Sequence, residues 1–129
     1  MIGVLPATGA TIASFLAYIL EKKLAKNPRV FVKISEVLRR VEGKVPMDLV
    51  FYKPRLDYLW QVFGEDRVIF GSDWPNSDNW AEYPAVFGIV REYAMSKGRA
   101  AAEEYFWLNS VAAYRWVKRT REQPGIARQ

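Results

Sequence analysis

Asp73 is the residue of this sequence best placed to do chemistry, because it directly follows a run of strand-forming residues. Val68-Ile69-Phe70 favours a β-strand, the run ends in Gly71-Ser72-Asp73, and Pro75 then prevents regular structure from continuing. A strand that presents a carboxylate at its C-terminal end is the way in which α/β barrels build active sites. Asp73 is therefore interpreted as one ligand of a functional site. The structural alternative is that an Asp after Gly-Ser caps a turn.

The residue types that usually accompany such a carboxylate are missing from the sequence. The 129 residues include no His and no Cys, which excludes disulfides, thiolate catalysis and Cys-based metal sites. Ser72 consequently has no imidazole partner that could activate it as a nucleophile. The lack of disulfides is compatible with a reducing compartment, and we expect a cytoplasmic protein.

Three further side chains are candidates for contact with a substrate. Lys33 falls in a predicted strand on the same face as Phe31, where its amine could bind an anionic substrate at a barrel mouth. Trp74 precedes the polar loop of residues 76–82, Trp80 lies within it, and both could line a substrate pocket. The alternatives are a strand-end amine that lies in solvent and two indoles that pack the loop onto the nearest helix.

The elements that would position these residues alternate between helix and strand. Strands predicted at Val30–Ile34 and Val68–Gly71 should be parallel neighbours, because a helix running from Pro54 to Gly64 forms a right-handed crossover between them. The remaining helices are predicted over residues 11–26, 84–98, 100–107 and 111–118. The expected fold class is α/β, with two short parallel strands and about five helices.

The chain has the length of one domain but not of a whole barrel. A complete eight-unit α/β barrel needs roughly 200 residues at least, and this sequence has 129. Asn109-Ser110 is expected to break or cap the last two helices. We place the domain at residues 1–118 and expect residues 119–129, which include Pro124 and Gly125, to be a flexible tail.

Three stretches combine unusual residues in a fixed order, at residues 27–35, 63–75 and 105–114. They resemble the seventh barrel strand, the eighth barrel strand and the closing helix of the amidohydrolase-related family of metal-dependent hydrolases. The combination Phe-Gly-x-Asp-Arg followed by Gly-Ser-Asp-Trp-Pro carries most of this likeness, since Gly-Ser-Asp alone is uninformative. The resemblance covers roughly residues 22–118.

The resemblance implies the C-terminal part of a TIM barrel, its last two β/α units, in an enzyme that hydrolyses lactones or amides with zinc or manganese. It implies that Asp73 is the strand-eight carboxylate that ligates the metal or takes a proton from the attacking water. The other ligands of the family are His residues, and this sequence has none. We therefore expect a fragment that binds no metal and is inactive on its own. The alternative is a non-catalytic, self-associating module derived from a barrel end.

Two parallel strands leave open edges and apolar faces, so we expect a homo-oligomer. A small-molecule substrate is expected only for the full-length enzyme. Nucleic acid is not an expected partner, although the formal charge is +5 and the sequence pI is about 9.6. The basic residues do not form one stripe, and much of the excess lies near the C-terminal end of the sequence.

A membrane anchor is the alternative that residues 1–20 raise, because they include no charged side chain. A spanning helix needs about 20 mostly apolar residues. Gly3, Pro6 and Gly9 interrupt the first half of this stretch, and no basic residue precedes it as a signal peptide requires. We therefore expect no membrane association.

Overall fold

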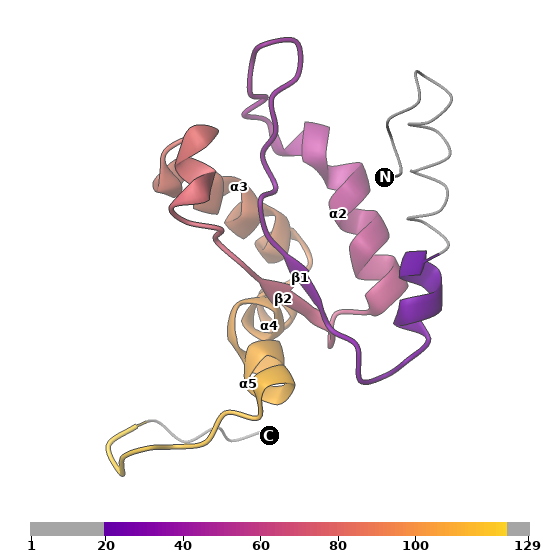
Figure 1. Ribbon diagram of the computed structural model, residues 1–129, viewed down its shortest axis with the longest axis vertical. Coiled ribbons are helices and arrows are strands. Elements are labelled where there is room, and N and C mark those ends of the chain that lie inside the picture. The colour runs from indigo at the N-terminus through magenta and orange to yellow at the C-terminus, as the bar shows by residue number, and fades with distance from the viewer. Residues whose placement is uncertain (1–19, 124–129) are drawn as a thin grey trace.

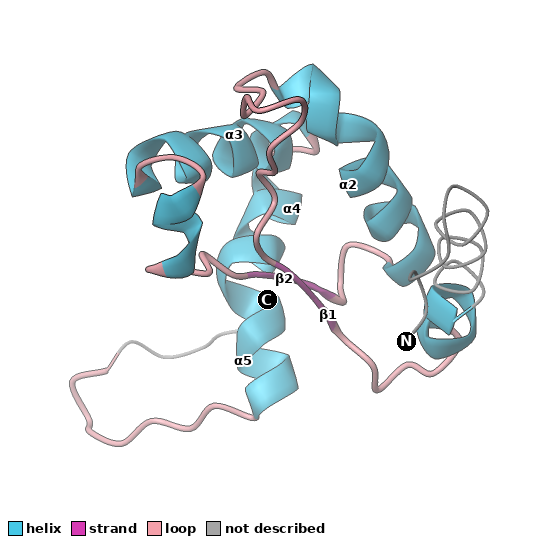
Figure 2. Ribbon diagram, turned by 45° about the horizontal axis from the view of Figure 1, so that its top comes forward, coloured by secondary structure: helices cyan, strands magenta, loops and turns pink. Residues whose placement is uncertain are grey.

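The computed structural model describes residues 20–123, and its two central strands pack against helices on one face (Figure 1, Figure 2). Residues 20–25 are helical, and the strand β1 (Val32–Ile34), the helix α2 (Leu49–Phe63) and the strand β2 (Val68–Phe70) follow. The part of the predicted first helix before residue 20 lies outside the described residues. The order of helix, strand, helix, strand and further helices agrees with the α/β prediction.

The sheet consists of β1 and β2, which pair in parallel as predicted, with Val32 opposite Val68 and Ile34 opposite Phe70. Two flanking bonds extend the ladder, from Val32 N to Arg67 O at 2.9 Å and from Gly71 N to Ile34 O at 3.0 Å. The predicted strand from Val30 to Ile34 was two residues too long. Val30 N instead donates to Asn27 O at 3.0 Å, which closes a turn before the strand.

The crossover helix α2 begins earlier than predicted. Its N-cap is Asp48, whose Oδ1 accepts a hydrogen bond from Val50 N at 2.8 Å and so satisfies a backbone donor of the first turn. Pro54 therefore lies inside the helix, not at its start, and leaves the carbonyl of Val50 without its helical donor. The helix ends at Gly64, as predicted, where a φ of 84° requires a residue without a Cβ.

After β2 the chain forms a 3₁₀ turn, η1 (Asn76–Asn79), and the helix α3 (Tyr83–Ser96), which has Pro84 in its first turn as expected. The next three elements are helical and continuous: α4 (Arg99–Glu103), the π-helical turn η2 (Glu104–Leu108) and α5 (Asn109–Tyr114). The predicted break at Asn109-Ser110 was wrong, because Asn109 is buried and its amide bonds outside the helix. The last helix ends at Tyr114, four residues before the predicted Lys118, where Arg115 adopts a left-handed conformation with φ 50°.

The core lies between one face of the sheet and the helices. Side chains alternate along a strand, so Ile34, Val68 and Phe70 face the helices while Lys33 and Ile69 share the opposite face. The main buried side chains are Ile34, Leu38, Tyr52, Leu56, Trp60, Phe63, Val68, Val86, Ile89, Val90, Tyr93 and Tyr105. Between residues 20 and 123, no helix has both the length and the apolar character needed to cross a membrane.

Candidate functional site

Asp73 lies just beyond the C-terminal end of β2, where the sequence predicted a functional carboxylate. Its backbone has a φ of 55°, a left-handed conformation that Asp tolerates better than most residues. Its carbonyl oxygen accepts a hydrogen bond from Ser77 N at 3.0 Å, which ties the turn to η1. Ser72 Oγ accepts a bond from Trp74 N at 3.3 Å within the same turn. The Asp73 side chain is half-buried, so its carboxylate is held at the strand end and is still accessible.

Ser77 is a residue of this turn that no sequence pattern marks as functional. Only 1% of it is exposed, and its hydroxyl has no hydrogen-bond partner among residues 20–123. A buried polar group without a partner costs stability and is uncommon in native structures. The sequence carried no signal for it, because a Ser in a polar loop usually reaches solvent.

Lys33 extends along the sheet face that lies opposite the core. Its side chain is exposed, and its stem lies against Gly71, the residue that follows β2. A Cβ added at Gly71 would lie 2.6 Å from Lys33 Cε and 2.8 Å from Ser35 Cβ. Gly71 therefore allows an approach that any larger residue would obstruct.

The two tryptophans have different environments. Trp74 is 62% exposed and lines a shallow hollow with Ser72 and Tyr83. Trp80 is half-buried against the core, and the Arg40 guanidinium lies 5.9 Å from its ring centroid. Among the hollows that the described residues line, Lys33 and Trp74 belong to different ones, and the half-buried Trp80 packs against the core.

A cleft of about 480 Å³ opens beside Lys33, between the end of β1 and the first half of α2. Arg39 lies in its lining with the guanidinium 5.3 Å from the centroid of the Phe51 ring. Arg55 also lines the cleft, and it forms an ion pair with Glu21 at 2.5 Å. The complete lining is Lys33, Ile34, Ser35, Glu36, Val37, Arg39, Phe51, Tyr52, Arg55, Leu56 and Leu59.

The metal that the family resemblance implies does not fit the residues of this chain alone. Within the described part of the chain, no three carboxylate, His or Cys groups lie close enough together to hold an ion. A catalytic zinc site normally has three protein ligands, and Asp73 would supply one of them. The remaining ligands would have to come from other strands.

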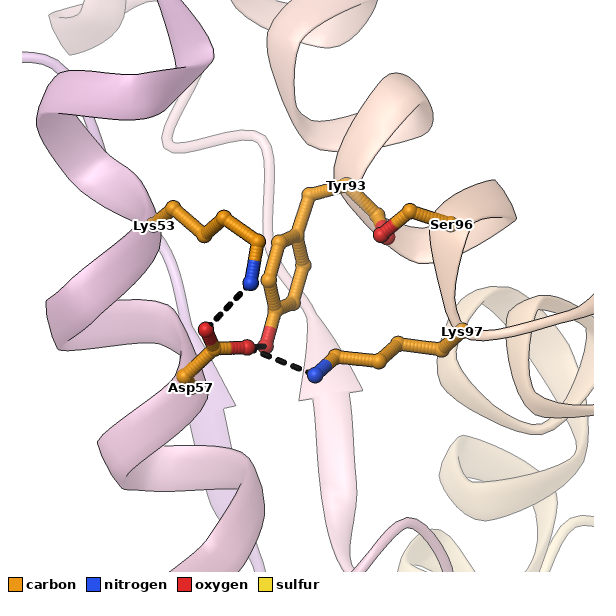
Figure 3. Close-up of polar contacts among 5 residues, drawn as sticks. All are labelled: Lys53, Asp57, Tyr93, Ser96 and Lys97. Atoms are coloured by element: carbon orange, nitrogen blue, oxygen red, sulfur yellow. Dashed lines mark hydrogen bonds and ion pairs between the residues drawn. The ribbon is translucent and has the colours of Figure 1, made fainter.

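A polar cluster joins α2 to α3, and none of the predicted site residues belongs to it (Figure 3). The Asp57 carboxylate accepts hydrogen bonds from Lys53 at 2.5 Å, Lys97 at 2.6 Å and the Tyr93 hydroxyl at 2.9 Å. The ammonium groups of Lys53 and Lys97 hold the pKa of Asp57 well below its usual range. Burial and the bond to Asp57 raise the pKa of Tyr93. The cluster connects the crossover helix to the helix that follows β2.

Comparison with known proteins identifies the family. The family model described as amidohydrolase matches residues 20–116. An L-fucono-1,5-lactonase from Burkholderia multivorans is 32% identical over 94 residues, which are 70% of this chain and 32% of the lactonase. This chain therefore spans about a third of the length of that relative.

Two crystal structures of an amidohydrolase from B. multivorans have a similar fold. The structure with bound HEPES has a TM-score of 0.68 at 24% identity, and the match covers 81% of this chain and 38% of the chain of that amidohydrolase. The structure with bound zinc has a TM-score of 0.64 at 26% identity, and the match covers 74% of this chain and 35% of the chain of that amidohydrolase. These matches confirm the resemblance seen in residues 27–35, 63–75 and 105–114. The chain belongs to the amidohydrolase family.

Proposed function

We propose that this chain forms the last two β/α units of a TIM-barrel hydrolase that opens lactones with a divalent metal. The observation that carries the proposal is the position of Asp73 at the C-terminal end of β2, which is the second of two parallel strands joined by a helical crossover. Active sites of α/β barrels lie at this end of the strands. The 32% identity to an L-fucono-1,5-lactonase supports a lactone as the substrate class.

In this proposal Asp73 is the carboxylate that the segment contributes to the active site. Trp74, which is largely exposed beside it, contributes an apolar wall for the substrate. Trp80 is less accessible to a substrate than Trp74, because its ring packs against the core. Zinc or manganese is the proposed cofactor of the complete barrel, and a solved relative with bound zinc supports this choice. The 129 residues alone supply one ligand, so we propose that they are inactive by themselves.

A complementation experiment tests the proposal directly. The chain is co-expressed with the part of the B. multivorans lactonase that it does not match, and turnover of L-fucono-1,5-lactone is measured with zinc. We expect turnover only when both parts are present, and a loss of about 100-fold or more in Asp73→Ala. Asp78→Ala is the matched control, because Asp78 is an exposed carboxylate of the same loop. Equal turnover in the Asp73 and Asp78 variants would contradict the proposed role.

The second candidate is a non-catalytic module that persists through self-association. It is favoured by three exposed apolar residues around the start of α2, namely Met47, Val50 and Phe51, whose exposed fractions are 49%, 71% and 40%. Within residues 20–123, each strand of the sheet is also paired along one edge only. A metal-free homo-oligomer without complemented activity would support this candidate over the hydrolase. A cytoplasmic location stays a prediction from the lack of cysteine.

A further inference from the structure

We propose that Lys33, held in place by Gly71, binds the carboxylate of a small hydroxy acid at the C-terminal end of the sheet. The inference rests on the proposed function, because opening a lactone produces such an acid. In that reaction water adds to the acyl carbon, and the bond between that carbon and the ring oxygen breaks. The ring oxygen takes a proton and becomes a hydroxyl, and the new acid loses its proton to solvent at neutral pH. The product therefore has a negative charge that the neutral lactone does not have.

The first observation is the close contact between Lys33 and Gly71. Three side-chain atoms of β1 and its continuation surround the position of a Cβ on Gly71: Lys33 Cε at 2.6 Å, Ser35 Cβ at 2.8 Å and Lys33 Cγ at 3.1 Å. Real Cβ atoms do not approach neighbours to 2.6 Å, so the lysine stem can lie flat on β2 only because Gly71 has no side chain.

The second observation is the direction in which the lysine extends. In the sheet register Lys33 is opposite Ile69, whereas its Cε lies against Gly71, two residues further along the chain and just beyond β2. A contact two residues further along the neighbouring strand shows that the stem leans toward the C-terminal ends of both strands. Asp73 lies at that same end. The lysine stem is thereby directed toward the end of the sheet at which the candidate site lies.

The third observation is the charge around this amine. Within the described part of the chain, the Lys33 ammonium has no hydrogen-bond or ion-pair partner. In the adjoining cleft, the charge of Arg55 is already offset by Glu21, and Glu36 is the carboxylate of the lining. Lys33 and Arg39 leave the cleft with a cationic excess, which favours an anionic ligand.

The test uses binding, so it does not depend on catalysis. The probe is gluconate, a hydroxy-acid anion, added to the ¹⁵N-labelled 129-residue chain at ionic strength held constant with chloride. Glucitol, a neutral polyol with the same carbon skeleton, is the reference compound. We expect gluconate, and not glucitol, to produce saturating shifts in the amide signals of Lys33 and Gly71. Lys33→Gln keeps most of the stem and removes the charge, and we expect it to weaken binding about tenfold or more.

Two further variants test whether gluconate binding depends on the position of the Lys33 charge. Lys118→Gln removes an exposed positive charge outside the cleft lining, and we expect its affinity for gluconate to be unchanged. Gly71→Ala should weaken binding because the new Cβ displaces the lysine stem. If Gly71→Ala fails to fold, Lys33→Gln alone decides the question.

Equal affinities for gluconate in Lys33→Gln and the unaltered chain would overturn the proposal. Equal shifts with glucitol, or no saturable binding at all, would overturn it as well. Such a failure would leave the hydrolase proposal standing, because complemented turnover and its dependence on Asp73 are measured separately.

Discussion

At the scale of single residues, the buried amide of Asn109 connects a helix to a strand through two hydrogen bonds. Asn109 is 2% exposed, and its Nδ2 donates to Glu65 O at 2.5 Å and to Val68 O at 2.9 Å. These two carbonyls flank the turn that leads into β2. The amide thus connects α5 to the strand that presents Asp73, and it satisfies backbone acceptors that the sheet leaves unpaired.

Replacing Asn109 with Ala should destabilise the fold by about 2–3 kcal/mol. The substitution removes two hydrogen bonds and leaves a buried carbonyl without a donor. Urea unfolding of the purified chain measures the difference in free energy. Ser110→Ala is the matched control, because the Ser110 hydroxyl bonds only to Trp107 O in its own helix, and its loss should stay within about 0.5 kcal/mol. Equal losses in both variants would show that the Asn109 amide has no special role.

Asp57 gives a prediction about pH. Its pKa is lowered in the folded state, mainly by Lys53 and then by Lys97, so the ionised carboxylate stabilises the fold at pH values above its ordinary pKa. That contribution is lost as the pH falls through the lowered folded-state pKa. The side chain is 35% exposed, so solvent screening limits the effect to about 1 kcal/mol. Asp57→Asn should therefore be less stable than the unaltered chain at pH 7, and the difference should shrink below about pH 4.

Thermal unfolding at a series of pH values checks this prediction. Asp78→Asn is the control, since Asp78 is exposed and has no ion-pair partner among residues 20–123. A deficit of Asp57→Asn that stays constant from pH 7 down to pH 3 would contradict the account of the cluster.

At the scale of elements, the sequence predicted what depends on local patterns and missed what depends on packing. The parallel pairing of β1 with β2 followed from the crossover helix, and Gly64 and Pro84 marked helix ends correctly. The start of α2 was missed because the Asp48 cap, not Pro54, determines it. The sequence did not predict that α4, η2 and α5 are continuous, because an Asn residue usually favours the end of a helix. Here the Asn109 side-chain amide instead donates a hydrogen bond to Val68 O of β2.

The Asp48 cap supplies the prediction at this scale. Asp48→Ala should cost about 1 kcal/mol, because Val50 N loses the side-chain oxygen that it donates to. Asp48→Ser should retain most of the stability, since a serine hydroxyl can accept the same bond. Chemical denaturation of both variants measures the difference. An alanine variant as stable as the serine variant would mean that α2 does not depend on this cap.

At the scale of the whole molecule, the described residues place Asp73 beyond the end of a strand and bring no three potential metal ligands together. The position of Asp73 could be predicted because a strand followed by Gly-Ser-Asp-Trp-Pro is a local pattern. The contact of Lys33 with Gly71 could not be predicted, because it depends on the register of two strands that are 36 residues apart in the sequence. The unpartnered Ser77 hydroxyl could not be predicted either, since burial of a loop residue is a tertiary property.

The exposed apolar residues at the start of α2 lead to a prediction about assembly. We expect the chain to form a homo-oligomer at micromolar concentration, because a two-stranded sheet and exposed apolar side chains favour association. Light scattering coupled to size-exclusion chromatography measures the mass. Val50→Asp should shift the mass toward the monomer, whereas Val117→Asp, also at an exposed valine, should not. A monomeric unaltered chain would refute the prediction.

The most direct test of the account is lactone turnover by the 129-residue chain alone, measured with added zinc or manganese. The account predicts no turnover above that of the free metal, because the sequence has no His and no three carboxylates of its described part lie close enough together to hold an ion. It also predicts that Asp73→Ala and the unaltered chain give the same result in this assay. Metal-dependent turnover by the unaltered chain, abolished in Asp73→Ala, would contradict the account, because it would show that these residues complete a site by themselves.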